Sequence, residues 1–257
     1  QGQVKIRGIR VIHSGEDGVR IVGGPGSVVD QVEIHDSARD GIHLVDSAGS
    51  TIVRSSISEV GRDAIRIDRS DGSVVQRNSI EGVAMGVLPT DSFAAINGEY
   101  SSGLLISGNQ IRSVAYIGIR FKRSSVVEFN LLEGICKRMG DCGALMAWAR
   151  LDPKPGFQSR VQRNIIRNVG SDVPEDEIGN AVAAGIYLDD LSSEVEVAQN
   201  VIENSPIGVL IHNSTGHTLT GNMVIGSRDC SICLVGGMNE EVVEAMGSNI
   251  ISGNTLV

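Results

Sequence analysis

The chain of 257 residues carries a net charge of −9, is 41% apolar and only 3% aromatic, and contains 32 glycines. This length suits one large domain or two small ones, and the negative charge disfavours nucleic acid as a partner. No apolar run reaches the roughly 18 residues that a membrane-spanning helix needs, so the sequence predicts no membrane span.

A short strand pattern recurs along the chain: a small residue, here called the lead, then an apolar, a variable and a second apolar residue. The steps between successive leads are 23, 23, 22, 32, 25, 42, 23 and 23 residues. This period predicts a solenoid, because one coil cannot bury its apolar face until another coil stacks on it. The nine predicted leads are Gly18, Gly41, Ala64, Gly86, Gly118, Gly143, Gly185, Gly208 and Ser231.

An asparagine recurs at a corresponding place in each later period. Equivalent side chains of parallel coils lie about 4.8 Å apart, so these amides are predicted to hydrogen-bond to one another in a ladder. Val32 and Ser55 take this place in the first two periods, so the ladder is expected to begin in the third. Its predicted members are Asn78, Asn109, Asn130, Asn164, Asn200, Asn222 and Asn254.

Together these patterns predict an all-β fold, a single-stranded right-handed parallel β-helix solenoid of about nine coils, as one domain over residues 1–257. The pattern resembles the pectate-lyase-like, carbohydrate-active β-helix superfamily along the whole chain. The resemblance implies an extracytoplasmic protein, secreted or periplasmic. Both ends interrupt the repeat and the chain starts at Gln1, so we expect a processed fragment whose caps lie outside this sequence.

The four cysteines are an even number, and they are expected to be free buried thiols or to form one loop disulfide. The spacing of Cys230 and Cys233 also resembles a redox or zinc pair, but no second cysteine or histidine pair lies at ligand spacing. The sequence therefore predicts no metal site at the cysteines, which are Cys136, Cys142, Cys230 and Cys233.

Three insertions are predicted from the long periods, at residues 90–101 after the fourth strand, 149–160 after the sixth and 170–183 before the seventh. Insertions on a solenoid commonly form the walls of its binding face. A groove is therefore predicted at the middle of the sheet that the recurring strands form. The acidic residues 172–177 could bind calcium, although they lack EF-hand spacing and also suit a solvated turn. No other cofactor is expected.

Strand alternation predicts two outward columns, two and four residues after each lead. The first column holds Arg20, His43, Arg66, Leu88, Arg120, Leu145, Tyr187, Leu210 and Cys233. The second holds Val22, Val45, Asp68, Thr90, Lys122, Ala147, Asp189, His212 and Val235.

A cationic stripe in these columns would suit the carboxylate or sulfate groups of an acidic glycan. The alternative is a solvated face whose cations form ion pairs with Asp46 and Asp68. The members of this predicted stripe are Arg20, His43, Arg66, Arg120 and Lys122.

Candidate catalytic residues are densest on the sixth to eighth coils. Asp141 precedes the sixth strand, Asp189 and Asp190 end the seventh, and His212 follows Asp189 by one period of 23 residues. Glycosidic cleavage needs two carboxyl groups, one ionised and one protonated, although an aspartate before glycine also suits a turn. The candidate substrate-binding residues are Tyr187, Arg120, Lys122, Trp148, Arg150, Arg66 and His43.

Residues 185–216 resemble the active-site strands of the β-helix β-xylosidases, whose nucleophile is an aspartate at the end of a strand like that before Asp189. Asp189 matches that nucleophile. The acid of those enzymes is a glutamate one coil later, but His212 takes that place here. A histidine can act as an acid or base near neutral pH, so the retaining mechanism of that family does not simply transfer.

The sequence favours a glycoside hydrolase that cleaves a polysaccharide or oligosaccharide, with Asp189 as nucleophile or base and Asp141 or His212 as acid. One alternative is a lyase or C5-epimerase on uronate polymers, in which Tyr187, His212 or Lys122 moves the proton. The Asp-Pro-His motif typical of alginate epimerases is absent from the sequence. Another alternative is a non-catalytic glycan-binding or structural domain, since a fold alone does not fix activity.

Overall fold

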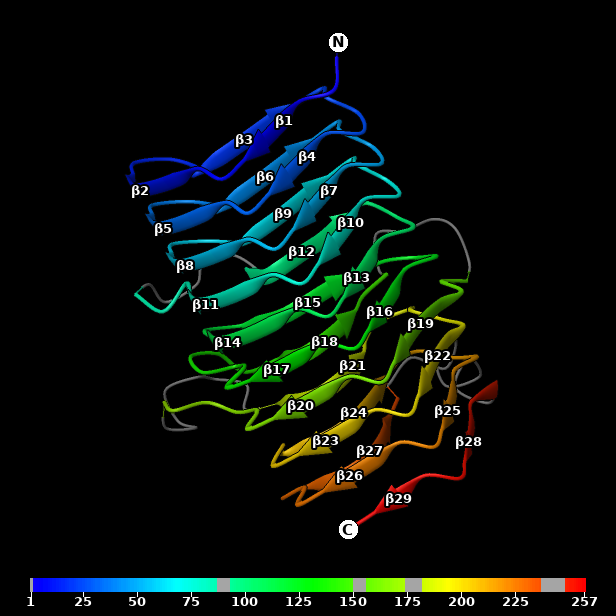
Figure 1. Ribbon diagram of the computed structural model, residues 1–257. Coiled ribbons are helices and arrows are strands. Elements are labelled where there is room, and N and C mark those ends of the chain that lie inside the picture. Colours follow the sequence, from blue (N-terminus) through cyan, green and yellow to red (C-terminus); the bar gives the residue numbers. More distant parts are fainter. Residues whose placement is uncertain (1, 87–92, 150–155, 174–181, 237–247) are drawn as a thin grey trace.

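The computed structural model describes residues 2–86, 93–149, 156–173, 182–236 and 248–257. The chain winds around one axis, and each turn adds one strand to each of three parallel sheets (Figure 1). The nine strands of the third sheet mark nine coils, as predicted for a right-handed parallel β-helix. Within the described ranges, no helix is long and apolar enough to cross a membrane.

The three sheets are named A, B and C in the order in which the chain enters them. Sheet A contains β1 (Lys5–Arg7), β4 (Val28–Asp30), β7 (Thr51–Val53), β10 (Val74–Gln76), β13 (Leu105–Ser107), β16 (Val126–Glu128), β19 (Ser159–Gln162), β22 (Val195–Ala198), β25 (Thr218–Thr220) and β28 (Ile250–Ser252). Sheet B contains β2 (Arg10–Ser14), β5 (Glu33–Ser37), β8 (Ser56–Val60), β11 (Ser79–Val83), β14 (Gln110–Val114), β17 (Leu131–Glu133), β20 (Ile165–Arg167), β23 (Val201–Glu203), β26 (Met223–Ile225) and β29 (Thr255–Leu256). Sheet C contains β3 (Val19–Val22), β6 (Ile42–Val45), β9 (Ile65–Asp68), β12 (Ala94–Tyr100), β15 (Ile117–Phe121), β18 (Cys142–Ala147), β21 (Ala183–Leu188), β24 (Ile207–His212) and β27 (Cys230–Val235).

The interior is filled by columns of aliphatic side chains, one residue per strand. Successive side chains of a strand point to opposite faces, so the central residue of a three-residue strand points inward while its neighbours point out. The eight members of the sheet A column between its two terminal strands are at most 1% exposed, which explains how a chain with few aromatic residues forms a continuous core. This column contains Val29, Ile52, Val75, Ile106, Val127, Val161, Val197 and Leu219.

The predicted asparagine ladder lies at the corner between sheets A and B. The residue before each member adopts a positive φ, which turns the chain sharply from one sheet into the next. Asn200 shows the pattern: its Nδ2 donates to Asn222 Oδ1 and to the backbone oxygen of Val161, both at 2.9 Å. Its Oδ1 accepts from the backbone N–H of Asn164 at 3.0 Å. The ladder is therefore confirmed, and it satisfies backbone groups that the corner leaves unpaired.

Replacing Asn200 by alanine is expected to lower the free energy of unfolding by about 1–3 kcal/mol. Asn200 is fully buried, and its loss removes a hydrogen bond from two backbone groups of the preceding coil and from the Asn222 side chain of the following coil. Urea unfolding followed by circular dichroism measures the change. An effect no larger than that of Gln110→Ala, whose side chain is exposed, would show that the ladder adds nothing to stability.

Two serine ladders accompany the asparagines and were not predicted. In each, a hydroxyl oxygen accepts a hydrogen bond from the backbone N–H one coil before it. The signal was present in the sequence as serines spaced by one period. The first ladder includes Ser27, Ser50 and Ser73, and the second Ser47, Ser70 and Ser101.

The fourth strand of sheet C differs from the prediction. The expected lead, Gly86, lies in a turn after β11, and the strand is β12, in which Ile96 pairs with Ile65 and Ile119. The lead of this coil is therefore Ala95, and the insertion precedes the strand instead of following it. The residues around Gly86 satisfy the strand pattern equally well, but only Ile96 completes the buried column of sheet C.

This shift changes the outward columns. Leu88 and Thr90, expected at the fourth coil, lie outside the described residues. Asn97 takes the place of Leu88, since it pairs with Arg66 and Arg120.

The sixth strand is displaced by one residue from its predicted register. Gly143 and Ala144 are both small, and Ala144 is the lead, because Leu145 pairs with the buried Ile186. A slip of one residue moves every side chain of a strand to the other face. The outward residues are therefore Met146 and Trp148, in place of Leu145 and Ala147.

Candidate active site

The outward face of sheet C carries a groove of about 610 Å³ over the third to seventh coils. Its lining combines acidic, arginine and aromatic side chains. The acidic residues are Asp63, Glu99, Asp141, Asp189 and Asp190, the arginines are Arg62, Arg66 and Arg120, and the aromatic residues are Phe93, Tyr100, Tyr116 and Trp148. A second depression of about 310 Å³ continues over the sixth to ninth coils, and it shares Asp141, Asp189 and Asp190 with the groove. These three residues are called the carboxyl cluster.

Asp189 directly follows β21, where its backbone N–H donates to the carbonyl oxygen of Ala147 at 2.8 Å. Its side chain points out of the solenoid into the groove, as predicted, yet only 7% of the residue is exposed. His212 ends the strand of the next coil, and its Nδ1 lies 2.8 Å from Asp189 Oδ1. Burial raises the pKa of Asp189, and the hydrogen bond from His212 partly offsets this rise.

The protonation of His212 follows from its neighbour Asn213. The Asn213 Nδ2 group donates to Asp190 Oδ1 at 2.9 Å and lies 3.1 Å from His212 Nε2. Because an amide nitrogen can only donate, His212 Nε2 accepts, and Nδ1 carries the hydrogen that is donated to Asp189. The two aspartates of β21 are thus each oriented by a donor from the next coil.

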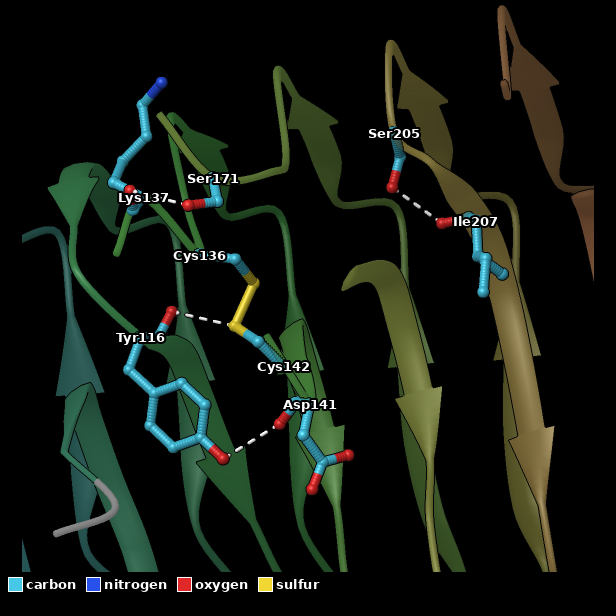
Figure 2. The surroundings of a disulfide bond; sticks show 8 residues. All are labelled: Tyr116, Cys136, Lys137, Asp141, Cys142, Ser171, Ser205 and Ile207. Carbon is cyan, nitrogen blue, oxygen red and sulfur yellow. Dashed lines mark hydrogen bonds between the residues drawn. A yellow bond between two sulfur atoms is a disulfide. The ribbon is translucent and has the colours of Figure 1, made fainter. Parts of the chain in front are cut away.

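Asp141 reaches the same place from the turn before β18. Its backbone has a φ of 51°, and its carbonyl oxygen accepts a hydrogen bond of 2.8 Å from the Tyr116 hydroxyl (Figure 2). A disulfide between Cys136 and Cys142 holds the same turn, and its sulfur atoms lie beside Tyr116 in Figure 2. The Asp141 Oδ1 atom accepts a hydrogen bond of 3.1 Å from the Tyr187 hydroxyl.

Cys230 and Cys233 also form a disulfide, so none of the four cysteines of the chain is free. The expectation of free thiols or a single disulfide is therefore wrong. Neither sulfur of this pair is a thiolate that could bind zinc.

Both tyrosines of the site are held as hydrogen-bond donors. Burial raises the pKa of Tyr187 far above its usual range, and the charges of Asp189 and Asp141 raise it further. Burial and Asp141 raise the pKa of Tyr116 to about 12. Neither phenol therefore ionises near neutral pH.

The predicted cationic stripe is not an exposed array of positive charge. Arg120 is only 5% exposed and its Nη1 lies 3.0 Å from Glu99 Oε2. His43 and Arg66 each contact Asp68 Oδ2 at 2.9 Å. The ion-paired alternative is therefore confirmed for Asp68, whereas Asp46 pairs with an arginine outside the stripe, Arg69. The other stripe residues, Arg20 and Lys122, line neither depression among the described residues.

The predicted insertions contribute unequally to the groove. Residues 90–101 supply groove residues because β12 lies within them, and Trp148 lines the groove just before residues 149–160. Residues 149–160 and 170–183 are described only in part, and Arg150 lies outside the described residues, so their roles stay predictions. Calcium binding at residues 172–177 also stays a prediction, and Asp172 forms an ion pair of 2.8 Å with Lys137.

Asp63 is a groove residue that the sequence did not single out, because it precedes its strand as Asp17 and Asp40 precede theirs. Its Oδ1 accepts from the Ala94 backbone N–H at 2.6 Å, and its Oδ2 from Asn97 Nδ2 at 3.1 Å. Burial, reinforced by the charge of Asp40, raises the pKa of Asp63 to about 7.

The raised pKa of Asp63 predicts that the free energy of unfolding changes with pH. Its folded pKa of about 7 exceeds the ordinary value of 3.8, so the folded state binds the proton more tightly. The resulting stabilisation is fully present below the unfolded pKa and is lost as the pH rises through the folded one. The slope attributable to Asp63 is about −1.4 kcal/mol per pH unit between the two values.

The difference in unfolding free energy between wild type and Asp63→Asn, measured in urea, should therefore change with this slope between about pH 4 and 7. The exposed variant Asp36→Asn should show no comparable slope. Parallel pH profiles for wild type and Asp63→Asn would contradict the shifted pKa.

Two clusters of the described residues bring ligand-type atoms within 4.8 Å of one another: Asp189 with Asp190 and His212, and Asp17 with Asp40 and His43. In the first cluster the nearest nitrogen, Nδ1 of His212, carries a hydrogen and has no free lone pair for a metal. The carboxyl cluster therefore fits proton transfer better than metal binding.

The sequence model of a protein family, the right-handed β-helix region, matches residues 1–150 of the chain. No curated protein sequence matches the chain. Among solved structures, one described as a glycoside hydrolase aligns with a TM-score of 0.59 and 14% identity. The alignment covers 90% of this chain and 40% of the glycoside hydrolase chain. The A-module of mannuronan C-5 epimerase AlgE6 from Azotobacter vinelandii aligns with a TM-score of 0.51 and 15% identity. The alignment covers 90% of this chain and 65% of the epimerase chain.

At such identities these two likenesses concern the fold alone, and the chain spans less than two thirds of either structure. The family model covers more than half of the chain, and the three stacked parallel sheets agree with it. The chain belongs to the right-handed β-helix family.

Proposed function

We propose that the chain forms the catalytic part of a glycoside hydrolase that cuts a polysaccharide in the groove of sheet C. The observation that carries this proposal is the carboxyl cluster, which lies where the groove and the second depression meet. Hydrolysis of a glycosidic bond needs one carboxyl group that gives a proton and another that acts as base or nucleophile. The structure described as a glycoside hydrolase shares this fold.

Within the cluster, Asp189 suits the general acid. Its pKa is raised by burial, which keeps a carboxyl group protonated at higher pH. Asp141 accepts the Tyr187 hydrogen bond and presents acceptor oxygens to the same space, which suits a base or nucleophile. This assignment exchanges the two roles expected from the sequence. His212 then positions Asp189 through Nδ1 and adjusts its proton affinity.

The shape of the site favours cleavage within a glycan chain. The groove extends from the carboxyl cluster toward the N-terminal coils and the second depression toward the C-terminal coils. Sugar rings on both sides of the scissile bond therefore have binding space. Trp148 and Tyr100 offer apolar ring faces on one side, which suit the C–H face of a sugar.

The charges of the groove favour a neutral glycan over an acidic one. Five acidic side chains line it against three arginines, and two of those arginines pair with carboxylates inside the protein. A uronate polymer would meet net repulsion at the carboxyl cluster. Because polysaccharide substrates of this kind, neutral or acidic, are met outside the cytoplasm, we also propose that the protein is secreted or periplasmic.

A lyase or C5-epimerase remains the second candidate, since Tyr187 and His212 lie side by side with ring centres 6.4 Å apart. An epimerase module shares the fold. However, abstraction of a proton from C5 needs a base, and the raised pKa of Tyr187 keeps its hydroxyl protonated. Of the three groove arginines, Arg62 alone has no carboxylate partner among the described residues, and it lies over the Phe93 ring. One such arginine on the third coil offers little charge to neutralise uronate carboxylates at the carboxyl cluster, so this chemistry fits the groove less well.

The full-length protein on a panel of neutral and acidic glycans tests the proposal. We expect new reducing ends from a neutral polysaccharide, an early fall in viscosity, and no ultraviolet absorbance from unsaturated sugars. Unsaturated products would show a lyase, and epimerised uronate without cleavage an epimerase. Glycan binding without turnover that survives Asp189→Asn would show a binding domain, and each of these three results would overturn the hydrolase.

A further inference from the structure

A second group of ligand-type side chains lies at the N-terminal end of sheet C, away from the carboxyl cluster. Asp17 precedes β3, Asp40 precedes β6, and His43 lies in β6. Their carboxylate oxygens and the imidazole nitrogen lie within 4.8 Å of one another. None of the three side chains is more than 7% exposed, so the carboxylates need a positive partner.

The tautomer of His43 is fixed by Asp68 of the next coil. The Nε2 atom lies 2.9 Å from Asp68 Oδ2, which also accepts from Arg66 Nε at 2.9 Å. A carboxylate only accepts, so Nε2 carries a hydrogen. The other ring nitrogen, Nδ1, therefore turns toward Asp17 and Asp40, and both of these are acceptors as well. Either a proton or a metal ion must therefore lie between Nδ1 and the two carboxylates.

A proton on Nδ1 would make only one long hydrogen bond, to Asp17. The Nδ1 atom is 3.4 Å from Asp17 Oδ2 and 3.7 Å from Asp40 Oδ2, beyond the usual 2.7–3.2 Å of an N–H···O bond. The Asp40 Oδ2 atom is buried and has no hydrogen-bond partner among the described residues. Two ligands of one tetrahedral zinc ion, each at about 2.0–2.1 Å, are separated by roughly 3.3 Å, close to the distances seen here.

We propose that Asp17, Asp40 and His43 bind one divalent transition-metal ion of the zinc class. One nitrogen and two carboxylate oxygens are ligands that zinc accepts, and a water molecule would complete the tetrahedron. Asp68 then acts as the outer carboxylate that orients the metal-bound histidine through its other N–H, an arrangement that increases the basicity of the ligand.

The charges around this group agree with one divalent cation. Arg20 and Arg39 approach Asp17 at 3.9 and 3.8 Å, beyond hydrogen-bond distance, and their side chains are 53% and 38% exposed. They are therefore screened by solvent, and both approach Asp17 and not Asp40. The ion would join the first coil to the second through its ligands and to the third through Asp68. Because the unfolded chain lacks this arrangement, binding should stabilise the fold.

The test uses the full-length protein, freed of metal by a chelator and then dialysed against Zn²⁺ or Co²⁺ alone. We expect one ion per chain, a higher Tm on binding, and a cobalt absorption spectrum of tetrahedral nitrogen and oxygen ligation. His43→Ala and Asp40→Asn should each abolish saturable binding. Asp68→Asn, which removes no ligand, should weaken binding by about 10–100-fold.

His13→Ala is the matched control, since His13 also contacts an aspartate, Asp36, at 2.6 Å but is exposed. It should bind metal as wild type does. The proposal is overturned if wild type binds no ion up to millimolar concentration, or if His43→Ala binds as tightly as wild type. Should His43→Ala fail to fold, the cobalt spectrum of wild type decides, and octahedral all-oxygen ligation would also overturn the proposal.

Discussion

Replacing Asp189 by asparagine is expected to lower kcat for glycan cleavage by about 10²–10⁴-fold, the usual contribution of a general acid or base. Asparagine keeps the shape of the side chain and can still contact His212, but it has no proton to give to the leaving oxygen. Because asparagine has the same shape and its oxygen can still accept the His212 hydrogen bond, the free energy of unfolding should change by no more than about 1 kcal/mol. The KM should change less than kcat, since binding along the groove uses other side chains.

The matched control is Asp36→Asn, which removes an exposed carboxylate on sheet B and should leave kcat unchanged. Initial rates of reducing-end formation compare the variants, and circular dichroism confirms that each is folded. A kcat for Asp189→Asn within about threefold of wild type would remove Asp189 from the reaction, because losing an acid with this role costs at least a hundredfold.

Replacing Ile186 by alanine is expected to lower the free energy of unfolding by about 2–5 kcal/mol. Ile186 is fully buried in β21, where it pairs with Leu145 on one side and Val209 on the other. Removing most of its side chain loses apolar contact with both neighbouring coils and leaves a cavity that stacked coils cannot easily close. Urea unfolding followed by circular dichroism measures the effect.

Ile165→Ala is the control for this effect. Ile165 points outward from β20 and is 38% exposed, so its loss should cost no more than about 0.5 kcal/mol. Equal losses in the two variants would mean that the inward and outward columns of the solenoid are assigned to the wrong faces.

The sequence was sufficient for the solenoid because its signals repeat. Every coil places equivalent residues one period apart, so Asn200 or Ile186 can be assigned by comparison with several other coils. The prediction failed where a coil departs from the period. The residues around Gly86 match the strand pattern by themselves, and only the packing of Ile96 between neighbouring coils shows that the strand lies later.

The predicted register of the sixth strand was wrong for a different reason. Gly143 and Ala144 are adjacent small residues, and either suits the lead. The choice depends on whether Leu145 or Met146 fits the buried column, which is a question of shape across coils. The consequence for the site was that Trp148 replaced Ala147 in the outward column beside Asp189.

The candidate site was predictable where it follows the columns of the solenoid. Asp189 and His212 were placed side by side because they are separated by one regular period. Asp63 was missed because the sequence treats it as a turn residue, and its raised pKa arises from burial that only the stacked coils create. The cationic stripe was misjudged because an outward position does not reveal that Arg120 is buried against Glu99.

The central claim is that the carboxyl cluster acts on a glycan bound along the groove of sheet C. A crystal structure of the full-length Asp189→Asn protein with a bound oligosaccharide of its substrate tests this claim most directly. We expect a sugar chain that runs over the carboxyl cluster, with a glycosidic oxygen in hydrogen-bond reach of the substituted side chain at position 189 and Asp141 beside the adjoining anomeric carbon. An oligosaccharide bound on sheet A or B, or one whose glycosidic bonds all lie beyond reach of both side chains, would contradict it.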